Sequence, residues 1–497
     1  MEQAKKTFEK LFWLLLLASP VLDVINGIWA YVLSGGDGYM LSSLNLVTLP
    51  SMSPSLTVRM AFLVVMTAYV FLQKQWRSVL MFVTIGGCWV LTVGYEFLRG
   101  VSFSLSADIQ YIVRFCYCLL VLVCYTILFK KDGRGTEALR SDVDKALTIS
   151  LLISATGVVL PFLLDMGFYT YADPLGFRGN RGFFYAGNDI TAVTMLILPV
   201  VLAAWMETEE VKKPCFAWLQ AGTCAVSLLS MLLVGTKTAF LGLGVTLASL
   251  GVFAFINGLW KKNWRAMIRM LTVFLALVLL AVTVNFANLG VRAIRPDQKQ
   301  VIPYAPPQST TLFQTITGSA TVTEKYQDYL EDKNPEEPED PDDPENPDDP
   351  EQPTEPKPSN PSAAETIIFS GRTGKLRKAL GEFKAALPLS AAVGIGRGSQ
   401  EFIIEMDLIE VVLYYGLLGT VCMLWLYLSQ GVKVVIDLFR SFSLRNLAVC
   451  VALGLTVGFL FLAGHILFSV TAGYYFAFMI VYARLFCTKD GIKTRIP

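Results

Sequence analysis

The sequence predicts an all-α integral membrane protein with about twelve transmembrane helices and one large external loop. Hydrophobic residues make up 54% of the 497-residue chain, and charged residues only 16%, whereas charged residues make up about a quarter of a soluble chain. The apolar residues also occur in blocks, and a helix needs roughly 20 mostly apolar residues to cross a bilayer. A soluble fold of this size could not bury so much apolar surface, so the blocks indicate membrane spans.

Twelve blocks reach or approach the length of a span. The range is ten to thirteen, because the second block is short and the last two are almost continuous. The first block is too long for a signal-peptide core and lacks a clear cleavage site, although Asp23 and Asn26 interrupt it. The predicted spans lie near 11–33, 58–73, 78–98, 111–129, 147–168, 188–206, 217–234, 238–259, 267–286, 408–429, 446–466 and 468–486.

These spans divide the chain into three parts. Residues 1–286 contain the first nine spans, residues 287–406 form a large loop, and residues 407–497 contain the last three spans and a tail. Every second connection is rich in Lys and Arg, beginning with the segment before the first span, and such connections usually lie in the cytoplasm. We therefore expect a multi-pass cell-membrane protein with both termini cytoplasmic and the large loop outside.

The large loop contains a strongly acidic tract. The chain as a whole has a net charge of +1, but residues 331–355 contain thirteen acidic residues and one lysine, a charge of −12. Proline prevents helix formation and the carboxylates repel one another, so we expect residues 331–360 to be extended and disordered. A solvated spacer is the main interpretation, and binding of calcium or of the cell wall is the alternative.

Cysteine and histidine usage excludes several kinds of site. All nine cysteines lie in or beside predicted spans, and the large loop contains none, so external disulfides are not expected. No metal-ligand spacing appears, and the chain has one histidine, His465. We expect no metal, no cofactor and no nucleic-acid partner.

The first candidate site precedes the sixth span. Arg178 and Arg181 are three residues apart among glycines, so their guanidinium groups could surround one anion. Asn188 or Asp189 would cap the following helix, whose positive end would face the same anion. The alternative is that both arginines anchor the chain to lipid headgroups.

A second candidate is Lys237, in a very tight outside turn between two spans. A lysine there cannot retreat far into water, so it would pair with a phosphate or a carboxylate. A simple capping turn is the alternative.

The third candidate is the end of the large loop. Residues 371–387 have a helical pattern with an apolar stripe and basic first turns, typical of an amphipathic helix on the outer membrane interface. Binding to anionic lipid explains its lysines, but Arg372 at the N-terminus opposes the helix dipole unless an anion lies between them. The stripe consists of Leu376, Leu380, Phe383 and Leu387.

Glycines and carboxylates follow this helix. Residues 393–399 resemble a phosphate loop, but no strand precedes them, so we expect them to let backbone pass close to a substrate or a helix. Glu405, Asp407 and Glu410 lie at the entry to the tenth span. Asp407 and Glu410 can share a helix face. Either Asp407 caps the helix, or a carboxylate here faces external arginines and acts as a general base.

The order of these motifs resembles the O-antigen ligase and polymerase superfamily, in particular Gram-positive members that polymerise teichuronic acid or exopolysaccharide. The resemblance covers the chain from about the fifth span to the C-terminus. It is based on Arg181-Gly-Phe-Phe before Asn188, Gly-Thr-Lys237-Thr, Ser-Gly-Arg372, Val-Gly-Ile-Gly, Glu405-x-Asp407 and Tyr415-Gly416-Leu-Leu-Gly.

This resemblance implies a GT-C-type helical fold and a glycosyltransferase that uses polyprenyl-diphosphate-linked saccharides at the outer leaflet. A second saccharide or a lipid-glycan would be the acceptor. Arg181 and Arg372 match the family positions that engage the diphosphate, and Arg178 and Lys237 would assist them. Family ligases use a histidine near the entry to the next span, where this chain has Glu405 and Asp407 instead. His465 is the fallback, and a structural role is its alternative.

Arginines in a partly dry site neutralise a departing diphosphate without a metal ion. One carboxylate would serve as the base, and attack opposite the diphosphate would invert the anomeric centre. Two other classes remain open: a lipid-linked sugar flippase or polysaccharide exporter, and a sensor or scaffold. Transporters usually have internal repeats, and we find no convincing repeat here. Ionisable residues within the predicted spans include Asp23, Glu96, Arg114 and Asp165.

Overall fold

The computed structural model describes most of the hydrophobic part of the chain. The described residues are 2–33, 53–132, 134–164, 166–173, 176–208, 214–261, 264–286, 291–292, 372–400, 403–440, 442–462 and 464–487. The acidic tract at 331–360, Asp165 and the end of the tail lie outside the described residues.

The described part is a bundle of helices, which confirms the predicted fold class. Eleven of these helices are long and apolar enough to cross a membrane, and α18 is a shorter apolar helix. The helices are α1 (Glu2–Leu33), α3 (Pro54–Leu72), α4 (Trp76–Leu98), α5 (Leu105–Lys131), α6 (Thr136–Leu163), α7 (Gly187–Glu207), α8 (Pro214–Val234), α9 (Lys237–Lys261), α10 (Trp264–Phe286), α14 (Arg372–Ala385), α15 (Leu389–Val393), α16 (Asp407–Arg440), α17 (Leu444–Leu462) and α18 (Ala472–Phe486).

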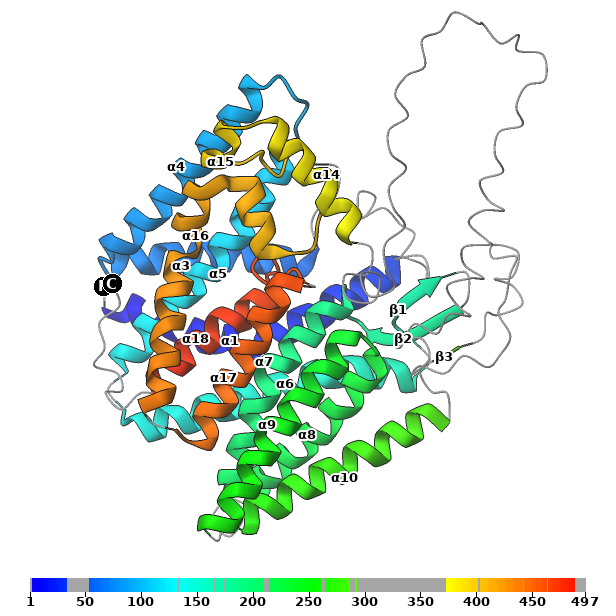
Figure 1. The fold of residues 1–497 in the computed structure, drawn as a ribbon. Helices are drawn as coiled ribbons and strands as arrows, with labels where there is room; N and C mark the ends of the chain where they lie inside the picture. Colours follow the sequence, from blue (N-terminus) through cyan, green and yellow to red (C-terminus); the bar gives the residue numbers. More distant parts are fainter. Residues whose placement is uncertain are drawn as a thin grey trace, which may run out of the picture.

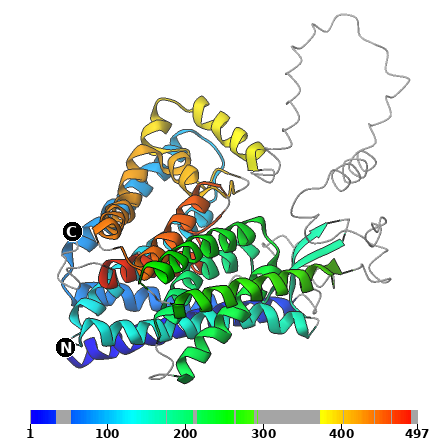
Figure 2. The ribbon, with the colours of Figure 1, turned by 60° about the horizontal axis from the view of Figure 1, so that its bottom comes forward.

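The helix α7 lies at the centre of the bundle. In its most apolar 18-residue stretch, 94% of the residues are buried, whereas the corresponding share for the peripheral α10 is 22%. Figure 1 shows α6 to α10 packed along one flank, whereas α14 and α15 lie with α4 and the first part of α16 at the opposite end. Figure 2 shows the same separation from a second direction. The predicted helix at 371–387 corresponds to α14, and its residues Leu376, Leu380 and Phe383 pack against the main core.

Three predicted span boundaries are wrong. The fifth span was expected to reach residue 168, but α6 ends at Leu163 and Phe168 begins a strand. Phe168 is fully buried beside Ala30 of α1, so its hydrophobicity reflects this local cluster. The last two spans were expected at 446–466 and 468–486, but α17 ends at Leu462 and α18 begins at Ala472. The backbone N–H groups of Ile466 and Leu467 bond to a side chain of α16, so they do not join a helix.

A small antiparallel sheet precedes α7. Its strands are β1 (Phe168–Asp173), β2 (Gly176–Gly182) and β3 (Val291–Arg292), in the order β1-β2-β3. The backbone N–H of Phe183 bonds to the carbonyl of Gly157 in α6 at 3.1 Å, which fixes the end of β2 on the bundle. This sheet therefore places the arginine-containing segment before α7.

The helix α16 is broken near its start. Gly416 has φ 62° and ψ −168°, a conformation that glycine adopts at little cost. The break frees two carbonyls of the preceding turn, which accept hydrogen bonds from Ile395 and Gly396 at 2.9 Å each. The Tyr-Gly-Leu-Leu-Gly pattern around Gly416 thus corresponds to a docking place for residues 394–400.

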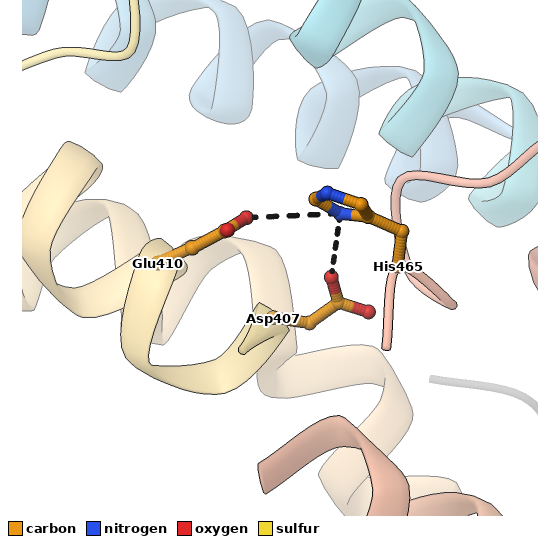
Figure 3. A group of neighbouring side chains, drawn as sticks. All are labelled: Asp407, Glu410 and His465. Atoms are coloured by element: carbon orange, nitrogen blue, oxygen red, sulfur yellow. Dashed lines mark ion pairs between the residues drawn. The ribbon is translucent and has the colours of Figure 1, made fainter. Parts of the chain in front are cut away.

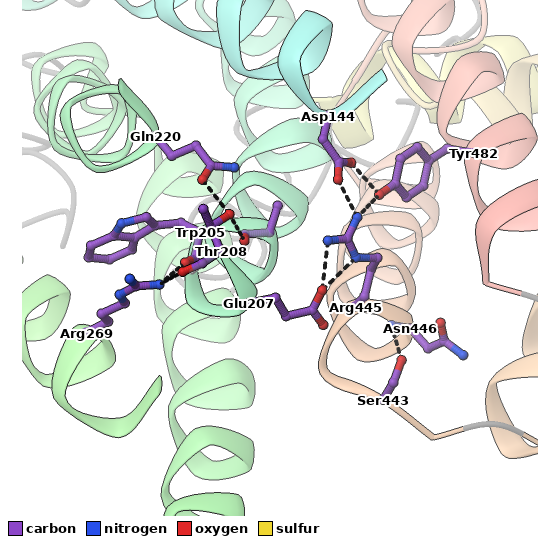
Figure 4. Close-up of polar contacts among 11 residues, drawn as sticks. Asp144, Trp205, Glu207, Thr208, Gln220, Arg269, Ser443, Arg445, Asn446 and Tyr482 are labelled. Atoms are coloured by element: carbon purple, nitrogen blue, oxygen red, sulfur yellow. Dashed lines mark hydrogen bonds and ion pairs between the residues drawn. The ribbon is translucent and has the colours of Figure 1, made fainter. Parts of the chain in front are cut away.

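A buried ion-pair network holds the other end of the bundle (Figure 4). Arg445 of α17 donates to Asp144 of α6 at 2.5 Å and to Glu207 of α7 at 2.8 Å, and its Nη1 also bonds to the hydroxyl of Tyr482 in α18 at 2.9 Å. These residues lie at the opposite ends of α7 and α17 from the predicted site. The helix ends that carry these residues therefore lie together at one end of the bundle, as expected if the connections alternate between its two ends.

Candidate functional site

Several of the predicted site residues meet where α9, α14 and α16 begin and where α17 ends. Arg372 is the first residue of α14, Lys237 is the first of α9, and Asp407 is the first of α16. His465 lies in the connection between α17 and α18. These residues are far apart in the sequence, so their proximity comes from the packing of the helices.

Arg372 is paired with Glu405. Its Nε and Nη2 atoms donate to Oε2 of Glu405 at 3.0 Å and 2.8 Å, and Lys375 lies 3.8 Å from the other carboxylate oxygen. The Arg372 side chain is only 12% exposed, and that of Glu405 is 36% exposed. Arg372 and Glu405 are therefore held together as a partly buried ion pair.

Glu405 has an unusual backbone. Its φ is 66°, a value that non-glycine residues adopt at a cost of order 1–3 kcal/mol. Its N–H donates to Oε1 of Glu410 at 2.6 Å, so a buried carboxylate holds this conformation in place. The glutamate side chain is thereby fixed relative to the first turn of α16.

Asp407, Glu410 and His465 form a compact cluster (Figure 3). Nδ1 of His465 lies 3.4 Å from Oδ1 of Asp407 and 3.9 Å from Oε2 of Glu410. Both carboxylates are fully buried, and Tyr111 of α5 donates its hydroxyl hydrogen to Glu410. Glu410 follows Asp407 by three residues, a spacing that indicates a shared helix face, whereas no pattern in the sequence indicates Tyr111.

The capping role considered for Asp407 is wrong. Its Oδ2 atom accepts hydrogen bonds from the backbone N–H groups of Ile466 and Leu467, at 2.5 Å and 2.7 Å. A parallel β-bridge between Met406 and Gly464 adds to this contact. Asp407 therefore holds the loop that carries His465, and its own helix does not use its carboxylate as a cap.

The charge state of His465 follows from these neighbours. Burial lowers the pKa of His465, but the hydrogen bond to Asp407 and the charges of Glu410 and Asp407 outweigh it and raise the pKa to about 9. The side chain is 28% exposed, although both ring nitrogens are shielded from solvent. The imidazole is therefore protonated at neutral pH and offsets one of the two buried carboxylates.

The same three residues offer the only metal-like grouping found in the described part of the chain. One ligand atom from each lies within 4.8 Å of the others. A metal ion binds neutral imidazole, whereas the raised pKa of His465 keeps its ring protonated at neutral pH. The sequence predicts no metal site, so this grouping is a finding of the structure that no spacing in the sequence indicates.

Asn188 and His465 line one small cavity, together with Thr191 of α7, Thr238 of α9 and Gly464. The expected capping by Asn188 or Asp189 is wrong, because α7 begins at Gly187 with Ala186 as its cap residue. Asn188 lies in the first turn, where its side chain reaches the cavity. The charge of Asp189 interacts with those of His465 and Arg114, so Arg114 of α5 also belongs to this region.

Lys237 begins α9 after a tight turn. The hydroxyl of Thr236 accepts a hydrogen bond from the N–H of Ala239 at 3.1 Å, so Thr236 provides the capping function considered for this turn. Lys237 and Arg372 lie close enough for their positive charges to repel one another. Two cations brought together in this way favour an anion between them.

Arg181 lies in β2, at the edge of the same region. Its guanidinium lies over the ring of Phe168, with 5.6 Å between Cζ and the ring centroid. Burial lowers its pKa to about 10, and its Nε has no hydrogen-bond partner among the described residues. The charge of Arg181 interacts with that of Asp189. The side chain of Arg178 lies outside the described residues, although its backbone pairs with Tyr171 in the sheet.

The glycine segment (residues 394–400) does not surround an anion from solvent. Its N–H groups donate to two carboxylates of the bundle, Asp108 of α5 and Glu96 of α4. The expectation that these glycines let backbone pass close to a helix is confirmed. A Cβ atom at Gly396 would lie 2.1 Å from the Glu96 carboxyl group.

Comparison with known proteins gives a family for this arrangement. No curated protein and no solved structure matches the chain. A family model described as O-antigen ligase like membrane protein matches residues 5–486, which is nearly the whole chain, so the protein belongs to this family of membrane enzymes that act on lipid-linked saccharides.

Proposed function

We propose that this protein is an inverting, metal-independent glycosyltransferase that polymerises or ligates polyprenyl-diphosphate-linked saccharides at the outer face of the cell membrane. Family membership supports the general class of enzyme. The observation that carries the specific proposal is the meeting of Arg372, Lys237 and Glu405 beside the cavity lined by Asn188 and His465.

The cations bind the donor diphosphate. Arg372 presents a planar guanidinium, which suits phosphate oxygens better than the point charge of a lysine does. Lys237 repels Arg372 in the absence of an anion, and a diphosphate between them removes that repulsion. Arg181, with a buried and incompletely bonded guanidinium, binds a second part of the same anionic group, and Arg178 of the same strand assists it.

Glu405 is the general base. In the resting state its carboxylate is occupied by Arg372. When the donor binds, Arg372 exchanges this carboxylate for a phosphate oxygen, and the freed carboxylate accepts the proton of the acceptor hydroxyl. The acceptor oxygen then forms a bond to the anomeric carbon while the bond from that carbon to the diphosphate oxygen breaks. Attack from the side opposite the diphosphate inverts the anomeric configuration.

The buried cluster supports this base. Glu410 fixes the N–H of Glu405, and Asp407 fixes the loop of His465. Asp407 is fully buried, so it does not reach a substrate hydroxyl directly. The roles expected for Glu405 and Asp407 are therefore divided: Glu405 accepts the proton, and Asp407 positions the site. The protonated His465 and the carboxamide of Asn188 face the cavity, where they orient the saccharide.

The test is transfer by the purified protein. The enzyme in lipid nanodiscs is given a polyprenyl-diphosphate oligosaccharide, and products are separated by chain length and identified by mass spectrometry. Elongated or transferred saccharide with inverted linkage supports the proposal. Unchanged donor at all acceptor concentrations, with folded protein, contradicts it.

A flippase or exporter is the second candidate, and one of the charges within the predicted spans has a structural explanation. Asp23 of α1 forms a buried ion pair with Arg59 of α3 at 2.5 Å and accepts a hydrogen bond from Thr471 at 2.6 Å. A paired charge of this kind stabilises helix packing without a transport role. The same nanodisc experiment separates the two, because a flippase leaves the donor chemically unchanged.

A further inference from the structure

Two buried carboxyl groups, one near the end of α4 and one near the start of α5, accept hydrogen bonds from the glycine segment. Asp108 accepts the N–H of Arg397 on Oδ1 at 3.1 Å and the N–H of Gly398 on Oδ2 at 2.9 Å. Glu96 accepts the N–H of Ser399 on Oε1 at 2.9 Å. Both side chains are fully buried. Three successive backbone donors of the segment thus end on carboxyl oxygens of the bundle.

One of the carboxyl oxygens in this pair accepts no hydrogen bond from the described residues. Oε2 of Glu96 is buried and receives no hydrogen from any described donor. Asp108 holds the two preceding N–H groups of the same segment, which brings the two carboxyl groups close enough for their charges to interact. Two ionised carboxylates in one buried site repel each other strongly. A proton on Oε2 of Glu96, donated to Asp108, satisfies both groups and removes the repulsion.

We propose that Glu96 and Asp108 form a carboxyl–carboxylate clasp, in which Glu96 holds the proton and Asp108 is ionised, and that this clasp positions the helix that carries Arg372. The two residues are positioning residues, because neither contacts the cavity of the candidate site.

The path from the clasp to Arg372 consists of direct hydrogen bonds and ion pairs. Gln400, at the end of the glycine segment, donates from Nε2 to Glu382 of α14 at 2.7 Å. Beyond the segment, Glu405 pairs with Arg372 itself. On the other side, Tyr95 of α4 donates to the carbonyl of Ala386 at 2.8 Å. The helix α14 is thus held near both of its ends by chain that α4, α5 and α16 fix in place.

The assignment of the proton predicts unequal effects for two isosteric substitutions. In Glu96→Gln the amide NH₂ replaces the carboxyl O–H and donates to Asp108, while its oxygen still accepts from Ser399. In Asp108→Asn one acceptor becomes an NH₂ group that faces a backbone donor, so a charge-assisted hydrogen bond is lost. Asp142→Asn, on an exposed part of α6, is the matched control.

The measurement is hydrogen exchange of the amides of residues 397–399 in nanodiscs, followed by mass spectrometry. We expect Asp108→Asn to accelerate exchange by about tenfold or more, and Glu96→Gln and the control to stay within about threefold of the wild type. Equal acceleration by both clasp variants, or by neither, overturns the proposal. If Asp108→Asn does not fold, Glu96→Ala, which loses the acceptor of Ser399, is compared with Glu96→Gln, and equal exchange overturns it.

A second measurement tests the link to Arg372, and only this part rests on the proposed function. Asp108→Asn should lower kcat/KM for saccharide transfer by about tenfold in the wild type and by less than about twofold in the Arg372→Ala background, because residues that act through one group are not additive. Full additivity contradicts the link. If no transfer occurs even in the wild type, the proposed function fails, while the exchange result still decides the clasp.

Discussion

Arg372 donates two hydrogen bonds, at 3.0 Å and 2.8 Å, to a single oxygen of Glu405. A bidentate pair of arginine and carboxylate normally uses both carboxylate oxygens. Here the second oxygen lies 3.8 Å from the ammonium group of Lys375. The arrangement keeps a cation and a base together, which suits a site where a bound anion replaces the carboxylate.

The first prediction concerns Arg372. Arg372→Ala should reduce kcat/KM for saccharide transfer by about 10²-fold or more, because one preorganised donor to a developing negative charge contributes on that scale. Arg372→Lys should recover only part of the loss, since a lysine cannot form the planar two-point contact. Transfer is measured with purified enzyme and a saturating acceptor.

The control is Arg377→Ala, which removes an exposed arginine from the same helix. It should leave transfer within about twofold of the wild type, as most surface substitutions do. Wild-type transfer by Arg372→Ala, in protein that remains in the membrane, is incompatible with the proposed role.

The second prediction concerns Glu405. Glu405→Gln should lower kcat by about 10²- to 10⁴-fold, the usual contribution of a general base. KM for the donor should not rise, because a glutamine no longer competes with the diphosphate for Arg372. Steady-state kinetics separate the two parameters, and Glu137→Gln, an exposed site on α6, is the charge-matched control. A raised KM with unchanged kcat would assign Glu405 to binding instead.

The third prediction concerns His465 and pH. Its pKa in the folded protein is about 9, above the usual value of about 6.5. A group with a raised folded pKa contributes stability that is fully present below the unfolded pKa and is lost as the pH rises through the folded pKa. Thermal stability should therefore fall between about pH 6.5 and pH 9. His465→Gln should flatten this part of the profile, and an unchanged profile would show that another group titrates.

Much of this fold follows from apolar periodicity alone. Long runs such as 78–98 and 217–234 can be satisfied only as helices in a bilayer, and α4 and α8 agree with them to within about three residues. Shorter apolar stretches were ambiguous. Phe168 was assigned to a span but belongs to a strand, because one buried aromatic carries no information about period.

Part of the site was predictable, because charged residues have few uses in a membrane protein. Lys237 and Glu405 are charges beside predicted spans, Arg372 opens the predicted amphipathic helix, and the structure brings the three near one another. The division of roles between Glu405 and Asp407 was not predictable, because it depends on the loop of Ile466, which is about 60 residues away in the sequence. The binding of Glu96 and Asp108 to the N–H groups of residues 397–399 also depends on packing between distant segments, and no local spacing in the sequence indicates it.

The fourth prediction concerns metal ions. Asp407, Glu410 and His465 have the spacing of a metal site, yet the protonated His465 already offsets one of the two carboxylates. Transfer should therefore survive extensive treatment with EDTA, with a rate within about twofold of the untreated enzyme, because the cations of the site are arginine and lysine side chains. If EDTA removes the activity, Mn²⁺ or Zn²⁺ restores it, and Glu410→Gln prevents that restoration, the cluster is assigned to a metal ion.

The last prediction concerns Arg181, whose guanidinium lies over Phe168 while its Nε lacks a hydrogen-bond partner among the described residues. A buried donor without a partner is costly unless a ligand supplies the acceptor. Arg181→Ala should therefore weaken donor binding and abolish detectable polymer or conjugate, with the protein still in the membrane. Arg181→Lys keeps the charge but loses the planar fork, so it should retain part of the activity.

Phe168→Leu separates donor binding by Arg181 from packing of Arg181 on the ring, because it removes the ring and keeps the guanidinium. If Arg181 serves only to pack against Phe168, both Arg181→Ala and Phe168→Leu lower thermal stability equally and transfer per folded molecule stays unchanged.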